Sequence, residues 1–211
     1  MSYNIHCING TQKVAKESST NLMWVILLAS LSIKQDFKLI GKQLKDVQVN
    51  GINSHYLFGF KKNTYKYLQQ HKHFIYSQFL AVINSNKSND DKALSLMQIF
   101  CRIDGIGLAK AGFICQLSAG LVGCIDSHNI KHDKYGIKLK DISLDKKVKC
   151  SVKRKNKIIN YINICHGIGT ENLWNTWCQL VFTNSNTKDK TKWLNSFTVS
   201  KVHYNYLREV I

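Results

Sequence analysis

A glycine-containing turn and a carboxylate further along the chain stand out within residues 103–129. The turn spans residues 104–107, and the carboxylate is Asp126. Glycine adopts positive φ without strain, and the helix predicted over 108–118 starts at the turn with backbone N–H groups that have no partner inside the helix. Such a turn is suited to a phosphate, and a lone carboxylate is suited to stabilising positive charge or orienting a nucleophile.

The predicted phosphate site consists of the backbone of Gly105, Ile106 and Gly107. Lys110, in the first turn of the following helix, is expected to meet a second phosphate oxygen. The alternative is an ordinary helical turn, because glycines in turns are common. For Asp126, at the expected start of the next helix, the alternative is a structural N-cap.

Apolar residues recur at helical intervals along most of the chain, and these intervals predict the elements that position the turn. The expected helices cover residues 21–33, 37–47 and 64–82, together with a helix that leads into the turn. Two further helical segments are expected near the C-terminus. Helix starts are predicted at polar residues that can accept N–H bonds, namely one of Ser19, Thr20 and Asn21 for the first helix and Asn89 or Asp90 for the helix before the turn.

The expected architecture is an all-α unit that covers residues 1–211. Only the short runs within 47–60 are ambiguous between strand and other structure, and neither a repeat nor a Gly/Ser linker divides the chain. We therefore predict two helical lobes, with the hairpin segment 93–130 between them.

The charge balance points to an acidic partner. The chain carries 30 Lys and Arg against 13 Asp and Glu, with a net charge of +17 and a pI near 9.6. Only Arg102, Arg154 and Arg208 are arginines. Lysine attracts phosphate but makes poorer two-point contacts with base edges than arginine, so binding to a DNA backbone is favoured over sequence recognition. The lysine-rich segment 138–157, taken alone, is typical of a solvated face.

Two groups of aromatic residues have opposite expectations. The first group is interspersed with lysines and comprises Tyr65, Tyr67, His71 and His73. It fits a single-strand-binding surface and a plain solvated helix face equally well. Trp174 and Trp177 share a helix face and are predicted to lie in the core rather than to stack on bases.

The cysteines and the most apolar run bear on the compartment. Seven cysteines, without a Cys-x-x-Cys pair, predict buried free thiols in a reducing cytoplasm and neither a metal site nor an iron–sulfur cluster. The run 22–33 is too short to cross a membrane. No targeting segment is recognised, so a cytoplasmic protein without a membrane partner is expected.

The wording "IDGIGLAKAGF" at 103–113, followed by "CIDSHN" at 124–129, resembles the helix-hairpin-helix DNA glycosylase superfamily. The resemblance implies a monomer that acts on DNA in the cleft between two helical lobes, with Asp126 as the catalytic acid. It implies that the turn grips DNA, with a monovalent cation as a possible ligand of its carbonyls. It also implies that His128 and Asn129 fix the next helix or touch the DNA backbone.

The chain departs from the family pattern at two places in the hairpin. Asp104 stands where the family has proline, which puts an acid near the DNA. Ala109 stands where lyase members carry their Schiff-base lysine, and Lys110 is one place later, about 100° around the helix. A bifunctional glycosylase-lyase is therefore disfavoured, and no cofactor is required.

The leading hypothesis is a monofunctional DNA glycosylase that flips a nucleotide out of the duplex and cleaves its N-glycosidic bond. One alternative is a transferase that modifies 5-hydroxymethyl-pyrimidine bases with an amino acid or amine. The wording "GLVGCIDSHN", "LWNTWC" and "VSKVHYNYL" is similar to phage-encoded relatives of that kind, which implies the host cytoplasm. The other alternative is a non-catalytic helix-hairpin-helix module that only binds DNA.

Overall fold

The computed structural model describes residues 5–32, 37–125, 129–130, 135–144, 151–174 and 176. All regular elements in these ranges are helical, which confirms the predicted all-α class. The elements are α1 (Ile5–Glu17), α2 (Ser19–Leu31), α3 (Phe37–Asn50), the short 3₁₀ helix η1 (Gly51–Asn53), α4 (Phe60–Ile83), α5 (Asn89–Phe100), α6 (Leu108–Ala119), α8 (Leu139–Ile142) and α9 (Ser151–Ile168).

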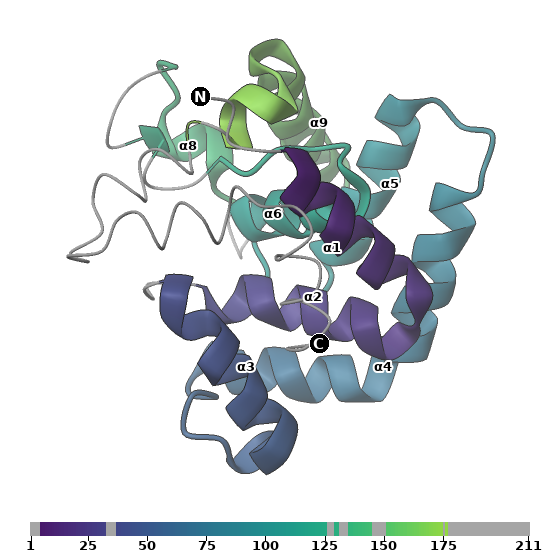
Figure 1. The fold of residues 1–211 in the computed structure, drawn as a ribbon. Coiled ribbons are helices and arrows are strands. Elements are labelled where there is room, and N and C mark those ends of the chain that lie inside the picture. The colour runs from purple at the N-terminus through teal and green to yellow at the C-terminus, as the bar shows by residue number, and fades with distance from the viewer. Residues whose placement is uncertain are drawn as a thin grey trace.

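Helix α2 is the centre of the fold. It runs across the middle of the molecule and packs against α1, α3, α4 and α6 (Figure 1). Its residues from Leu22 to Leu31 are almost all buried, as expected of a helix that is apolar on every side. The helix begins at Ser19, two residues before its predicted start at 21. Its N-cap is Ser18, whose hydroxyl accepts the N–H of Asn21, rather than any of the three predicted cap residues.

Helix α4 is longer than its predicted span, and its buried face also begins earlier than predicted. Leu68, Ile75 and Phe79 belong to its buried face, as their spacing predicts. Tyr65 is buried on the same face, as its spacing also predicts, so its interpretation as part of a solvated or binding surface is wrong. Lys61, one turn earlier, is buried beside it. Between α3 and α4 the chain forms turns and η1 rather than a strand.

The two helices beside the predicted phosphate turn are α5 and α6, which pack against each other. Ser88 caps α5 by accepting the N–H of Asp91, so neither predicted cap residue fills that role. Helix α6 ends at Gly120, which is left-handed with φ 71°. The helix therefore extends one residue beyond its predicted span of 108–118, and the left-handed glycine ends it.

Helix α9 completes the described core by packing against α5 and α8. Its Tyr161 is fully buried, and Trp174 further on stacks on Phe113 of α6 with ring centroids 6.4 Å apart. The core placement predicted for Trp174 is confirmed, whereas Trp177 lies outside the described residues.

Four cysteines in the described ranges are free and buried, as predicted for this class of thiol: Cys101, Cys115, Cys124 and Cys165. The described residues hold no group of three or more His, Cys, Asp or Glu side chains placed to bind a metal ion. Within the same ranges, each helix is too short or too polar to cross a membrane.

Candidate functional site

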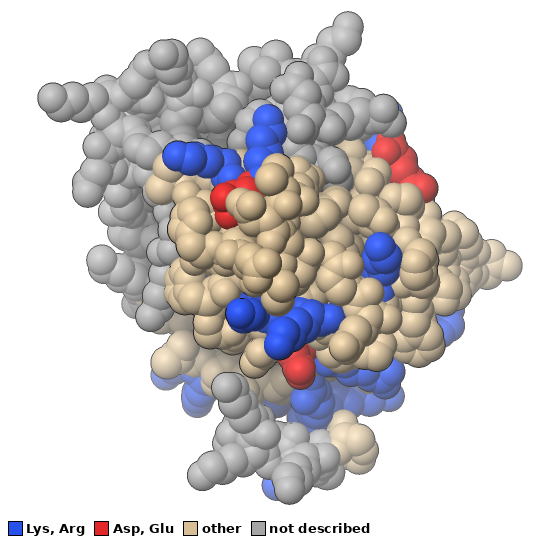
Figure 2. Space-filling view, turned by 90° about the horizontal axis from the view of Figure 1, so that it is seen from below, with Lys and Arg blue, Asp and Glu red and all other residues tan. Residues whose placement is uncertain are grey.

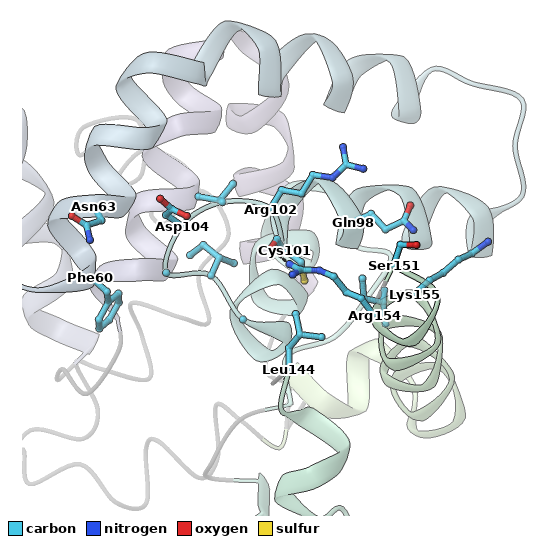
Figure 3. A pocket seen from close by; sticks show the side chains of 15 residues that line it. Phe60, Asn63, Gln98, Cys101, Arg102, Asp104, Leu144, Ser151, Arg154 and Lys155 are labelled. Atoms are coloured by element: carbon cyan, nitrogen blue, oxygen red, sulfur yellow. Dashed lines mark hydrogen bonds between the residues drawn. The ribbon is translucent and has the colours of Figure 1, made fainter. Parts of the chain in front are cut away.

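A groove of about 1020 Å³ opens along the turn between α5 and α6. We call residues 101–107 the hairpin turn, and all seven of them line the groove. The remaining lining comes from the start of α4, the end of α5, the segment after α8 and the start of α9: Phe60, Asn63, Gln98, Leu144, Ser151, Arg154, Lys155 and Ile158 (Figure 3). Gly105, Ile106 and Gly107, the predicted phosphate site, are thus part of this groove.

The hairpin turn is fixed against α4 by a hydrogen bond and a close approach. The buried hydroxyl of Thr64 donates to the Asp104 carbonyl over 2.6 Å. Gly105 has φ 83°, and a Cβ at this position would lie 2.6 Å from the same hydroxyl oxygen. Glycine is therefore required both by the backbone conformation and by the contact with α4.

Two buried isoleucines and a backbone hydrogen bond fix the shape of the turn. Ile103 and Ile106 are buried, and the Ile106 N–H donates to the Ile103 carbonyl over 3.0 Å. Helix α6 then starts at Gly107 without a side-chain cap. Its N-terminal N–H groups and the positive end of its dipole therefore lie at the groove.

Three basic side chains line the groove. Arg102 and Lys155 are exposed, and Arg154 is half-buried with its guanidinium donating to the Cys101 carbonyl. Asp104 is the single acid among the lining residues that the structure describes. The groove is consequently electropositive, and Arg154 also ties α9 to the hairpin turn.

The carbonyls of the turn do not form the open set that a monovalent cation needs. Those of Cys101, Ile103 and Asp104 already accept hydrogen bonds from Arg154, Ile106 and Thr64 respectively. The guanidinium also places a positive charge beside the first of them. These three carbonyls are therefore less available to the monovalent cation implied by the family resemblance.

The thiol of Cys101 is the one sulfur that lines the groove among the described residues. Burial raises its pKa to about 12, although the nearby charge of Arg154 acts in the opposite direction. A thiol with this pKa is protonated at neutral pH, so Cys101 is not an activated nucleophile.

Lys110 points away from the groove. Its ammonium donates to the Ser32 hydroxyl over 2.9 Å and lies 5.3 Å from the centre of the Phe113 ring. Lys61 approaches the same end of α2, where its ammonium donates to the Leu31 carbonyl over 3.2 Å. Lys110 is thus separated from the three predicted backbone residues, which line the groove together.

The chain returns to the start of α6 just before Asp126. The Cys124 N–H donates to the Gln116 side chain over 3.0 Å, and the Cys124 thiol points at the Ala109 carbonyl over 3.7 Å. Tyr161 holds the next residue, accepting the Ile125 N–H over 2.9 Å while its own hydroxyl donates to a carbonyl of this segment. The connector therefore runs back along α6 to its first turn.

The structure describes only one of the predicted site residues that follow Ile125. Asp126 and His128 lie outside the described residues. Asn129 is fully buried, which fits fixing of the local chain better than contact with a DNA backbone.

Sequence patterns missed the α9 wall and the α4 wall of the groove. Arg154 and Lys155 belong to a lysine-rich segment that is typical of a solvated face, and Phe60 and Asn63 precede the predicted start of their helix. One signal was present in the composition. Two of the three arginines of this lysine-rich chain, Arg102 and Arg154, line this one groove.

The groove therefore combines a rigid glycine turn, the start of a helix and three cations, which is an arrangement that holds phosphate groups of a polyanion. Comparison of the chain with protein-family models, with curated proteins and with solved structures gave no match.

Proposed function

We propose that this protein is a DNA-acting enzyme of the helix-hairpin-helix glycosylase kind, with the groove as its DNA-binding site between two helical lobes. The observation that carries the proposal is the joint lining of one groove by Gly105–Gly107 and by the cations Arg102, Arg154 and Lys155. Backbone N–H groups and cations together bind phosphates without reading bases. The proposed enzyme works as a monomer in the cytoplasm.

Asp126 is the proposed catalytic residue. A carboxylate beside a flipped nucleotide stabilises positive charge on the sugar as the base departs, or activates the attacking water. The contact between Cys124 and Ala109 supports this role, because it brings the chain back to the α6 end that begins at the hairpin turn. The catalytic step thus requires a carboxylate at position 126 and a strand held in the groove.

A monofunctional reaction is favoured by the first turn of α6. Position 109 is alanine, and the ammonium of Lys110 is engaged with Ser32 rather than directed into the groove. A Schiff-base mechanism needs an amine that reaches the sugar. Hydrolysis of the N-glycosidic bond without strand cleavage is therefore the proposed reaction.

The test is Asp126→Asn, with Asp90→Asn as the matched control because Asp90 is an exposed acid of α5 outside the groove. Both variants and the parent protein are incubated with duplexes that carry damaged bases, and with duplexes that carry 5-hydroxymethyl-pyrimidines activated at the hydroxyl, in the presence of free amino acids or amines. Mass spectrometry then follows the released bases and the nucleosides. We expect free base from the parent and from Asp90→Asn, and at least ~100-fold less from Asp126→Asn, with DNA affinity retained.

Two other outcomes would replace this proposal. A mass adduct on the 5-hydroxymethyl base, with an intact glycosidic bond, would identify a transferase. No product from any substrate, together with a lower melting temperature for Asp126→Asn, would make position 126 a helix cap in a DNA-binding module.

A further inference from the structure

The groove has two chemically different walls, one on each side of the hairpin turn. Phe60 and Asn63 of α4 lie at one end, whereas Arg154 and Lys155 of α9 lie toward the other, with the turn that carries Asp104 between them (Figure 3). One wall offers an aromatic face and an amide. The other wall offers positive charge.

The two phenylalanines at the start of α4 are exposed although their side chains are apolar. Phe60 is 40 % exposed, and Phe58 two residues earlier is 56 % exposed. Gly59 between them has φ 55° and ψ −131°, a backbone conformation that is essentially restricted to glycine. The chain thus enters α4 through a special glycine conformation between two partly exposed phenyl rings. The Lys61 ammonium lies over the Phe58 ring, 4.9 Å from its centre, and the Phe60 ring lines the groove.

Asn63 lies one helical turn beyond Phe60 and is also exposed in the groove. Its side-chain amide carries two donors and an acceptor, which match the polar edge of a nucleobase. A phenyl ring that stacks on the base face and an amide at the base edge form a complementary pair of contacts. An acidic peptide would satisfy the cations but would leave both of these groups unused.

The charges favour a polyanion over a single small ligand. Three cations and one acid, Asp104, are the charged side chains among the described lining residues. Lys and Arg also predominate over Asp and Glu among the described residues of the face shown in Figure 2. The groove volume of about 1020 Å³ is at the upper end of small-molecule sites, which hold roughly 300–1000 Å³. The groove therefore has room for more than one nucleotide of a strand.

We infer that the groove binds an unpaired stretch of nucleic acid, with phosphates at Arg102 and Lys155 and a base stacked on Phe60 beside Asn63. This inference rests on the proposed function and narrows its substrate to single-stranded or locally unpaired DNA. In an intact duplex each base face is covered by its neighbours, so a phenyl ring reaches it only after unstacking, which costs a few kcal/mol.

The test compares three labelled ligands of equal length by fluorescence anisotropy: oligothymidylate, the corresponding abasic sugar–phosphate strand and a duplex. We expect the parent protein to bind the oligothymidylate most tightly. Phe60→Ala should weaken that binding roughly 5- to 100-fold and leave the abasic strand unchanged, because base–aromatic stacking alone is lost. Phe60→Trp should restore it.

Phe74→Ala is the matched control, since Phe74 is a 61 % exposed phenyl of the same helix that does not line the groove. It should leave all three affinities unchanged. Thermal melting of each variant confirms that the fold is retained. Equal loss of the base-bearing and abasic strands in Phe60→Ala, or an unchanged affinity for both, would overturn the inference.

A charge variant separates failure of this inference from failure of the proposed function. If Arg102→Glu with Lys155→Glu weakens duplex and single strand alike while Phe60→Ala has no effect, the groove binds DNA but does not stack bases. If the charge variant changes no affinity, the groove is not a DNA site and both proposals fail.

Discussion

Two basic regions of the molecule use cationic side chains for opposite purposes. We call the C-terminal end of α2, with Lys61 and Lys110, the inward corner, and the groove, with Arg102 and Lys155, the outward corner. At the C-terminal end of α2, the ammonium groups of Lys61 and Lys110 hydrogen-bond to Leu31 and Ser32. At the groove, Arg102 and Lys155 are exposed. The net charge of +17 is therefore not one uniform binding surface, because part of it joins helices together.

Helix polarity explains the inward corner. The last carbonyls of a helix have no partner within it and carry partial negative charge. Lys61 is only 2 % exposed and donates to one of these carbonyls, while its stem packs between α4 and α2. Burial lowers the pKa of Lys61, and the neighbouring charge of Lys110 lowers it further.

The prediction with the largest change in DNA affinity reverses the charges of the outward corner. Arg102→Glu with Lys155→Glu should weaken binding to single-stranded DNA about 100-fold at low salt, because two phosphate contacts become repulsions. Titrations between roughly 50 and 200 mM salt should show a log–log slope reduced by about 2. The comparison variant is Lys42→Glu with Lys45→Glu, two exposed lysines of α3, and an equal loss there would show that only net charge matters.

The next prediction removes the buried ammonium of the inward corner and concerns the free energy of unfolding. Lys61→Ala should lower the free energy of unfolding by about 2–4 kcal/mol, since it removes a buried stem and leaves a helix carbonyl without its donor. Lys62→Ala, at an exposed position one residue later, should change it by less than about 0.5 kcal/mol. Urea denaturation measures both, and equal losses would remove the distinction between the two corners.

The pH dependence of the free energy of unfolding gives a second test of the same two variants. The folded protein holds the Lys61 proton less tightly than the unfolded chain, because its pKa is lowered on folding. Between the lowered pKa and the ordinary value of about 10.4, the unfolded state binds more protons, so stability rises with pH across this window. Lys61→Ala should lack this rise, and Lys62→Ala should keep it.

The smallest effect concerns the acid in the groove. Asp104→Asn should raise affinity for single-stranded DNA about 2- to 5-fold at low salt, because the exposed carboxylate repels phosphate while the Thr64 bond uses only the backbone carbonyl. Anisotropy measures the change, with Asp90→Asn as the comparison. An affinity that falls instead would give Asp104 a positive role in binding.

Local patterns predicted the elements better than their faces. The 3.6-residue period located α2, α4 and α6, and Gly120 marked the end of α6. The same period also contained the signal for Lys61, which lies one turn before Tyr65 and shares the buried face with Leu68. Its charge outweighed its position in the pattern, so Lys61 was not predicted for this face, whereas Tyr65, Leu68, Ile75 and Phe79 were predicted from the period and are buried.

The groove could be predicted only in part, because long-range packing forms it. The glycines of the hairpin turn are a local signal, and they do line the groove. The aromatic wall depends on the contact of Thr64 with the turn, and the basic wall depends on Arg154 reaching the Cys101 carbonyl. Partners so distant along the chain meet only after the helices pack.

Helix α9 has a mechanical consequence for both proposals. Arg154 at the groove and Tyr161 at the connector share one face of this helix, two turns and about 10 Å apart. Because both contacts are made by one uninterrupted helix, a shift of α9 at Arg154 would also shift the hydroxyl of Tyr161 that anchors Ile125. Under the proposed function, one helix would thus link the groove wall at Arg154 to the chain segment that ends at Ile125.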